Sequence, residues 1–296
     1  INAVGISAVH TIFNLFTTAL LCPFTKQLER FANFVIRPSK KKETYAFLDE
    51  RLLGTPSIAV GEASDMTVKM ATLARMTILS AINICQSYDV KVADEILKHE
   101  DELDLYEDKL GTFLVKLSSR SLSIADSRKV SNMLHTIGDF ERLGDHAVNL
   151  RKTAEEIHDK HIVFSEDAVK ELQNLTNALT EILELTIDAF SEHNLEMARH
   201  VEPLEQVIDC LISAAKSTHV ERLQSGKCTI QNGFVLNDLL TNYERVSDHC
   251  SNIAVSLIET SAGSFDTHEY LSEVKEGGSK DYTDLYHAYT KKYALQ

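Results

Sequence analysis

The chain has no tryptophan, and among its 296 residues there are only four prolines and 11 glycines. Leu, Ala, Glu and Lys abound instead. Helix interiors tolerate proline and glycine worst, so their scarcity predicts an almost entirely helical fold. Hydrophobic residues make up 44% of the chain, enough for a buried core, and its length can hold more than one domain.

Paired cysteine motifs are also missing. The five cysteines are odd in number, widely spaced and free of any C-x-x-C pattern: Cys22, Cys85, Cys210, Cys228 and Cys250. This distribution argues against a disulfide framework and against a thiolate zinc site. It indicates reduced thiols in a reducing compartment.

Positive charge is in short supply, with 30 Lys and Arg against 44 Asp and Glu, for a net charge of −14. Nucleic-acid binding needs a basic surface, so we expect no nucleic-acid partner. An acidic chain of this kind suits a protein that gathers cations.

The acidic residues recur in a duplicated pattern. Glu141, Asp145 and Asn149 are spaced by four and share one helix face. The pattern Glu, Arg, Asp, His and Asn returns 103 residues later, starting at Glu244 and including Asp248. A second E-x-x-x-D pair lies upstream of each copy at an offset of 105 residues: Glu100 with Asp104, and Glu205 with Asp209. Other matches, such as Glu155 with Asp159, have no counterpart and are attributed to the acidic composition.

Each copy is expected to be a three-helix bundle. The predicted helices span 57–86, 90–117 and 123–158 in the first bundle (57–160), and 165–192, 195–223 and 229–259 in the second (161–260). Pro203 is expected to kink the helix 195–223. Antiparallel neighbours would bring two E-x-x-x-D pairs together, and four carboxylates need a compensating cation. This predicts a mononuclear or multinuclear metal site in each bundle.

The histidines and arginines next to these acidic residues are not predicted to be metal ligands. His146 and His249 directly follow Asp145 and Asp248, so they point about 100° away on a helix, and a ligand role is the less favoured interpretation. Arg142 and Arg245 also turn off the acidic face. For them we expect ion pairs with a neighbouring helix rather than phosphate contacts.

The N-terminal segment has a different character. Residues 1–25 carry no formal charge, and 6–24 are largely apolar, long enough to span a bilayer as one helix. The alternative is a buried helix of a soluble core. The basic cluster that follows, from Lys26 to Lys42, marks a cytoplasmic side. We therefore expect a membrane helix, a basic linker over 26–56, and a cytoplasmic remainder that ends in a tail (261–296) with helices near 268–274 and 281–293. Because the first residue is Ile1, the sequence is interpreted as part of a longer protein.

Asp139-Phe140-Glu141-Arg142-Leu143-Gly144-Asp145-His146 and its weaker echo Tyr243-Glu244-Arg245-Val246-Ser247-Asp248-His249 resemble the D-x-E-R-x-x-D-x-x-x-N motif of PhoU domains. The resemblance covers about residues 57–259. It implies two tandem antiparallel three-helix bundles that bind multinuclear iron or zinc and regulate phosphate uptake negatively; manganese is a further candidate metal. The implied ligands are Glu100, Asp104, Glu141, Asp145, Glu205, Asp209, Glu244 and Asp248. Asn242 and Ser247 depart from the motif in the second copy.

The segment Asn2-Ala3-Val4-Gly5 and Ala8-Val9-His10-Thr11-Ile12-Phe13-Asn14 resembles the end of the second membrane repeat of bacterial type-II sodium/phosphate cotransporters. This implies a non-enzymatic regulatory domain at the C-terminus of a sodium-dependent phosphate transporter in the cell membrane. Its partners would be the remainder of its own transporter domain, a second copy of the chain, and sodium and phosphate as transported ions. Two alternatives remain open: a free-standing PhoU-type signalling adaptor and a carboxylate-bridged metal enzyme.

Overall fold

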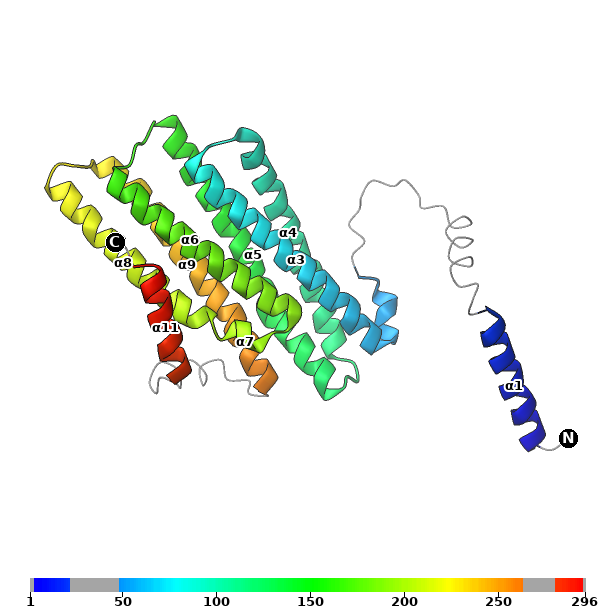
Figure 1. Ribbon diagram of the computed structural model, residues 1–296. Helices are drawn as coiled ribbons and strands as arrows, with labels where there is room; N and C mark the ends of the chain where they lie inside the picture. The colour runs from blue at the N-terminus through cyan, green and yellow to red at the C-terminus, as the bar shows by residue number, and fades with distance from the viewer. Residues whose placement is uncertain (1–2, 22–47, 263–279, 295–296) are drawn as a thin grey trace. The chain divides into compact units, whose positions relative to one another are not determined.

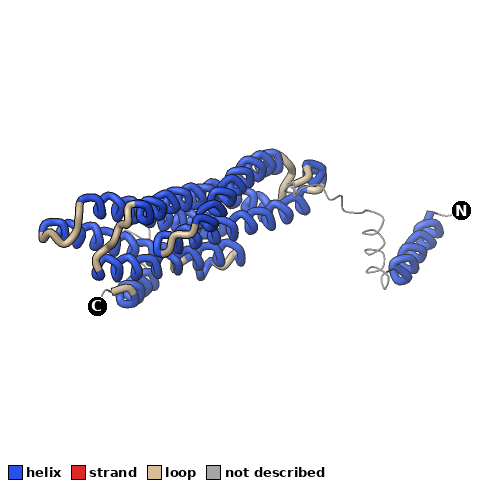
Figure 2. Tube along the Cα trace, turned by 90° about the horizontal axis from the view of Figure 1, so that it is seen from above, coloured by secondary structure: helices blue, strands red, loops and turns tan. Residues whose placement is uncertain are grey.

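Every regular element in the described residues, 3–21, 48–262 and 280–294, is a helix in this computed structural model (Figures 1 and 2). This confirms the all-α prediction. The chain divides into two units, residues 1–46 and 47–296. The predicted helix near 268–274 and most of the linker lie outside the described residues.

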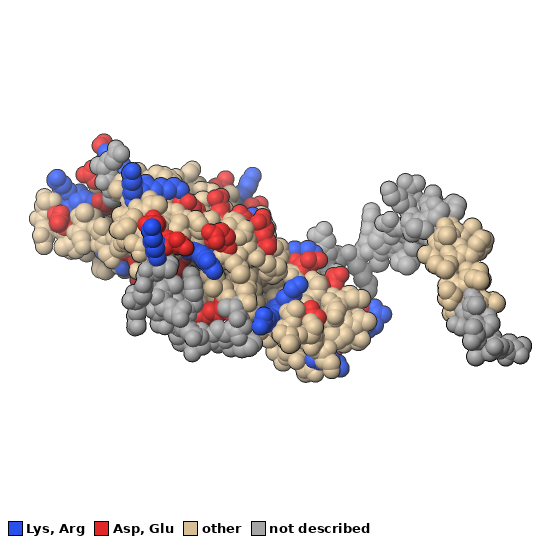
Figure 3. All heavy atoms as spheres, turned by 60° about the horizontal axis from the view of Figure 1, so that its bottom comes forward, with Lys and Arg blue, Asp and Glu red and all other residues tan. Residues whose placement is uncertain are grey.

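The first unit contains helix α1, Ala3–Leu21. Val9, Ile12, Phe13 and Phe16 each expose more than 60% of their surface, and α1 carries no Lys, Arg, Asp or Glu (Figure 3). The placement of residues 1–25 in a membrane stays a prediction.

The first repeat begins with the short 3-10 helix η2 (Glu50–Gly54), followed by α3 (Pro56–Gln86), α4 (Val90–Ser118) and α5 (Ile124–Asp159). Pro56 occupies the first turn of α3, where its missing N–H costs no hydrogen bond. The Asp89 carboxylate accepts from the Lys91 N–H, and the Ser123 hydroxyl accepts from the Asp126 N–H. These side chains start α4 and α5 by satisfying unpaired backbone donors.

The second repeat contains α6 (Glu166–Glu192), α7 (Leu195–Ala198), α8 (Val201–Gln224) and α9 (Ile230–Ala262). The single kinked helix expected over 195–223 is therefore two helices, and the break precedes Pro203. Proline cannot donate to the carbonyl four residues earlier, and its ring clashes with that carbonyl. Gly226, at φ +71°, follows the end of α8 in the left-handed conformation that glycine adopts without strain.

The two repeats share one hydrophobic core. Helices α5 and α9 pack against each other at the centre, with α3 and α4 on α5, and α6 and α8 on α9 (Figure 1). Among the residues whose side chains are described, α3 is the one helix long and apolar enough to cross a membrane. However, 44% of its most apolar stretch is buried inside the protein. Helix α11 (Lys280–Lys292) packs on α8, and Tyr289 is buried there.

Candidate functional site

The predicted acidic pairs of the first repeat lie on the adjoining helices α4 and α5, within electrostatic reach of one another. Burial, followed by the charges of Asp104, Asp101 and Asp145, raises the pKa of Glu100. Burial and Asp145 raise the pKa of Glu141; Arg142 opposes that rise, and Asp104 on the other helix adds to it. The structure thus places the four residues that the sequence selected on two adjoining helices, where their charges influence one another. We call Glu100, Asp104, Glu141 and Asp145 the first acidic cluster.

Gly144 lets α4 and α5 approach closely at the first acidic cluster. A Cβ atom built at Gly144 would lie 2.7 Å from Leu103 Cδ1 and 3.8 Å from Glu100 Cγ. Leu103 is fully buried, so its side chain has little room to yield. The glycine therefore has a packing role that the sequence signalled through the motif but did not explain. In the second repeat Ser247 takes this position, and its hydroxyl donates to the Glu244 carbonyl at 2.8 Å.

The ion pairs of Arg142 and Arg245 differ from the expectation. Arg142 contacts Asp145 at 2.9 Å and Glu141 at 3.5 Å, all on α5. Arg245 contacts Asp248 at 3.2 Å on α9. The expected partners on a neighbouring helix were wrong, because an i,i+3 carboxylate is already within reach of the guanidinium. Both arginine side chains are 60% exposed, so these pairs contribute little to stability.

The acidic residues of the second repeat have different surroundings. Lys216 on α8 places its Nζ 2.9 Å from Glu244 Oε2 on α9. The equivalent position in the first repeat is Gly111, which has no side chain to supply a cation. Glu205 is buried on α8, and Asp209 follows it one turn later at intermediate exposure. The second set of predicted ligands thus includes one carboxylate that a lysine already neutralises.

No three His, Cys, Asp or Glu side chains in the described ranges converge closely enough to hold a metal ion. The chemistry of the first acidic cluster nevertheless fits a cation. Burial first, and neighbouring carboxylates second, raise the pKa values of Glu100 and Glu141, and a bound cation would offset both effects. Side-chain rotation would be needed to complete a coordination shell. The predicted ligands in both repeats stay a prediction.

A second polar site lies at the seam between α5 and α9. His146 Nδ1 lies 3.0 Å from Asn242 Oδ1, and His249 Nδ1 lies 2.9 Å from Asp139 Oδ1. Asn242 and Asp139 occupy equivalent positions in the two repeats, as do the two histidines, so each repeat contacts the other reciprocally. The offset of 103 residues already relates Asp139 to Asn242 and His146 to His249. The prediction from sequence, however, considered the two histidines only as neighbours of the acidic face.

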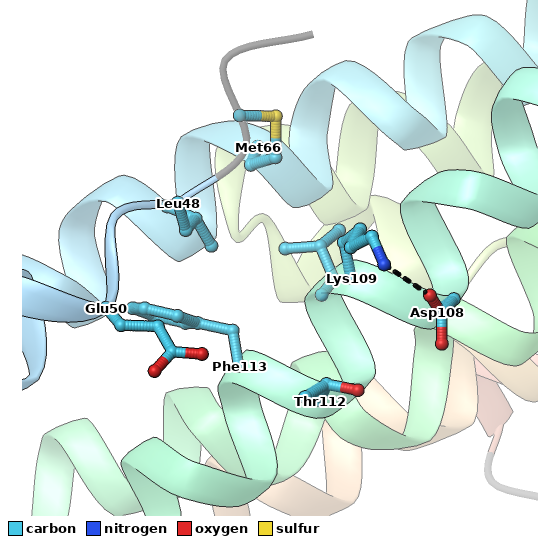
Figure 4. Close-up of a pocket in the computed structure, with 8 residues that line it drawn as sticks. Leu48, Glu50, Met66, Asp108, Lys109, Thr112 and Phe113 are labelled. Atoms are coloured by element: carbon cyan, nitrogen blue, oxygen red, sulfur yellow. Dashed lines mark hydrogen bonds and ion pairs between the residues drawn. The ribbon is translucent and has the colours of Figure 1, made fainter. Parts of the chain in front are cut away.

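A small pocket of about 220 Å³ lies apart from these sites, between η2, α3 and α4. Leu48 and Phe113 reach toward one another across it, and Lys109 turns to Asp108 at 2.9 Å (Figure 4). Lys116 ties the η2 residue Glu50 to α4 at 2.6 Å. We interpret this pocket as the packing of η2 against the first repeat.

Comparison with known proteins gives consistent results. The PhoU domain family matches residues 67–154 and 172–257. The phosphate-specific transport system accessory protein PhoU homolog of Clostridium acetobutylicum is 24% identical over 194 residues, covering 64% of this chain and 87% of that protein. The putative inorganic phosphate export protein YjbB of Salmonella typhimurium is 22% identical over 258 residues, covering 84% of this chain. This chain spans only 47% of that export protein.

Solved structures show the same fold. The crystal structure of PhoU from Pseudomonas aeruginosa superposes with a TM-score of 0.64 at 20% identity, covering 69% of this chain and 97% of that one. The phosphate transport system regulatory protein PhoU from Streptococcus pneumoniae gives a TM-score of 0.63 at 18% identity.

Proposed function

The chain belongs to the PhoU domain family, and on this premise we propose that it is a non-enzymatic adaptor that regulates phosphate transport. The observation that carries the proposal is the duplicated helical unit with a crowded acidic cluster on α4 and α5. Several relatives are named as accessory proteins of phosphate-specific transport systems, and the matches to two of them cover 64% and 71% of this chain. A component of such a transport system is therefore the proposed partner.

We propose further that the first acidic cluster binds iron, zinc or manganese. A bound cation would offset the burial and the neighbouring carboxylate charges that raise the pKa values of Glu100 and Glu141, and would change the charge of the surface formed by α4 and α5. For the second set, Lys216 would have to release Glu244 before that carboxylate could bind a metal. We therefore propose that the first cluster is the one that binds a metal more tightly.

Metal analysis of the chain purified without chelator tests this proposal. Replacing Glu141 and Asp145 together by Ala should lower the metal content while the helical circular dichroism signal is kept. The matched control replaces Glu155 and Asp159, an E-x-x-x-D pair on the same helix with no counterpart in the other repeat. An unchanged metal content in the first variant, or an equal loss in both variants, would remove the first cluster as a metal site.

The regulatory role has its own test. Expression of the chain in cells should lower phosphate uptake when internal phosphate is high, because an adaptor can bias a transporter only through different contacts with two of its states. The variant with both Glu141 and Asp145 replaced by Ala should restrain uptake less. Equal uptake with and without the chain, at equal transporter abundance, would contradict the regulatory proposal.

A second candidate is that these repeats are attached to a membrane transporter domain and restrain its sodium-coupled phosphate flux. Two observations favour it: the match to the phosphate export protein covers more of this chain than the match to the accessory protein of Clostridium acetobutylicum does, and α1 exposes apolar side chains around its circumference. Flotation with phosphatidylethanolamine–phosphatidylglycerol vesicles tests the anchor. Replacing Ile12 and Phe16 by Glu should release the chain, and vesicle binding unchanged by these substitutions would argue against α1 as an anchor.

A further inference from the structure

The turn between α4 and α5 concentrates positive charge on an acidic protein. Residues 115–129, which we call the α4–α5 tip, hold four cations and one anion: Lys116, Arg120, Arg128 and Lys129, against Asp126. The whole chain has a net charge of −14. The tip therefore has the opposite sign to the protein that carries it, and it is expected to attract anionic surfaces.

Three of these cations form no ion pair with a carboxylate of the described residues: Arg120, Arg128 and Lys129. We call them the three free cations; two are exposed and Arg128 is half-buried. Lys116, by contrast, is held by Glu50 of η2 at 2.6 Å. The Asp126 carboxylate accepts from the Ser123 hydroxyl at 2.9 Å and from the Ser57 hydroxyl at 3.4 Å. The one acidic side chain of the tip is thus engaged by hydroxyls, and the three free cations stay available to an external anion.

A large apolar side chain lies at the apex of the tip. Ile124 is the first residue of α5, and 76% of its surface is exposed. Leu122, two residues earlier, packs against the core, so the turn already has its apolar contact with the bundle. Arg128 follows Ile124 by one helical turn and lies on the same face of α5. The tip therefore presents an apolar side chain beside positive charge, an arrangement that core packing does not explain.

The tip lies at the end of the repeats that the chain enters from its N-terminal side. There η2 packs against α4, next to the turn between α4 and α5 (Figure 1). In the sequence, the run Lys40-Lys41-Lys42 ends six residues before Leu48, and the apolar, exposed α1 precedes that run. An exposed apolar helix and a basic run are both features of chains that bind anionic bilayers. The charge of the tip therefore continues a pattern that the preceding segment already has.

We propose that the α4–α5 tip docks on the surface of an anionic lipid bilayer. Ile124 would enter the headgroup region, and the three free cations would meet lipid phosphates. The tip is a turn between two helix ends and not a groove, and a bilayer recognises charge and apolar insertion without a complementary shape. The proposal requires neither a bound metal nor a particular transporter. Where α1 is an anchor, the contact of the tip adds to it.

A tryptophan reporter measures this contact, because the chain has no tryptophan of its own. In the full chain, Ile124→Trp should give emission that shifts to shorter wavelength and is quenched by brominated lipid as phosphatidylglycerol vesicles are added. Phosphatidylcholine vesicles should give little of either effect. The matched control is Val163→Trp, at a position 79% exposed beyond the far end of α5, which should stay unquenched. Equal quenching of the two reporters, or an equal response to the two lipids, would overturn the proposal.

A second set of variants, each combined with Ile124→Trp, tests the charge. Replacing the three free cations by Gln should weaken binding to phosphatidylglycerol vesicles by about tenfold or more in the lipid titration. The matched control removes the same charge from exposed positions at the opposite end and should leave the titration unchanged: Lys91→Gln, Lys170→Gln and Lys227→Gln. Replacing Arg120 and Arg128 by Lys should preserve binding, because a bilayer surface requires charge and not the planar geometry of a guanidinium. An unaffected Gln variant would overturn the proposal, and loss of binding in the Lys variant would also do so, because it would indicate a shaped phosphate site instead.

Flotation of the same samples separates the tip from α1. High salt should abolish the quenching of the Ile124→Trp reporter, because surface attraction is screened, and should leave any flotation through α1 in place. Flotation reports the α1 anchor and the tryptophan reports the tip, so the failure of one is distinguishable from the failure of the other. No response of the reporter to phosphatidylglycerol vesicles, even at high lipid concentration, would overturn the proposal and favour an acidic protein surface as the partner of the tip.

Discussion

The imidazole rings of His146 and His249 lie 5.5 Å apart, centroid to centroid, across the seam between α5 and α9. Each ring contacts the same relative position in the opposite repeat, which is Asn242 for His146 and Asp139 for His249. The reciprocity is chemically unequal, because Asp139 can balance a protonated imidazole and Asn242 cannot. The seam therefore contains one histidine with a balancing charge and one without.

Acidification should destabilise the chain through His146. Burial is the main cause that lowers the pKa of His146, and the nearby His249 adds to it, against the opposing effect of the Asn242 contact. In the unfolded chain His146 has a pKa of about 6.5, so as the pH falls it is protonated in the unfolded state before it is protonated in the folded state. The contribution of neutral His146 to the free energy of unfolding is therefore fully present above the unfolded-state pKa. It is lost as the pH falls toward the lower folded-state pKa. Urea unfolding at pH 7.5 and 5.5 measures the loss.

The variant His146→Gln should lose less stability over the same pH interval. Burial also lowers the pKa values of His193 and His219, so the difference between the parent chain and the variant is the informative quantity. An equal loss in both proteins would show that His146 does not carry this pH dependence.

Neutralising Glu100 should stabilise the metal-free chain at neutral pH. Its pKa is raised by burial and by the neighbouring carboxylates, so the folded state binds the proton more tightly and loses stability as the pH rises through that pKa. Glu100→Gln removes the repulsion and should raise the Tm by about 1 to 3 °C. Glu95→Gln, at an exposed position of α4, is the control and should leave the Tm nearly unchanged. A lower Tm for Glu100→Gln would contradict the crowded cluster.

Two glycines of α5 should respond oppositely to alanine. Gly138 has no atom within 4 Å of an added Cβ, so Gly138→Ala should stabilise the chain by up to about 1 kcal/mol through helix propensity. Gly144→Ala places a Cβ against the buried Leu103 and should cost about 1 to 3 kcal/mol. Urea unfolding compares both variants. If Gly144→Ala stabilised the chain as much as Gly138→Ala, the close approach of α4 and α5 would not matter.

The buried ion pair between Arg222 and Glu171 should be replaceable as a pair and not singly. Arg222 makes two bonds to Glu171, of 2.8 and 2.9 Å, with side chains only 10% and 14% exposed. Arg222→Leu alone leaves Glu171 without this partner and should cost about 3 to 5 kcal/mol. The first repeat has Leu117 and Met66 at these positions. The double variant Glu171→Met with Arg222→Leu should therefore recover most of the loss in thermal unfolding, and equal destabilisation of both variants would contradict this.

The helices and the duplication could be predicted from sequence because both depend on short-range or repeated patterns. The N-terminal starts of α4, α5 and α6 follow from Asp89, Ser123 and Ser165, whose side chains accept hydrogen bonds from backbone N–H groups of the first helical turn. The offset of 103 to 105 residues selected Glu100, Asp104, Glu141 and Asp145, and antiparallel packing of adjacent helices was enough to place them on facing elements.

Interactions between helices depended on the tertiary structure. Whether Lys216 reaches Glu244, or His146 reaches Asn242, depends on how α8 docks on α9 and how α5 docks on α9. Gly144 likewise permits the close approach of α4 to α5, and a sequence pattern gives no interhelical distance. Helix formation is determined by neighbours three and four residues apart, which the sequence states directly. The partners of a side chain are determined by packing between segments about 30 to 100 residues apart, which only the folded chain brings together.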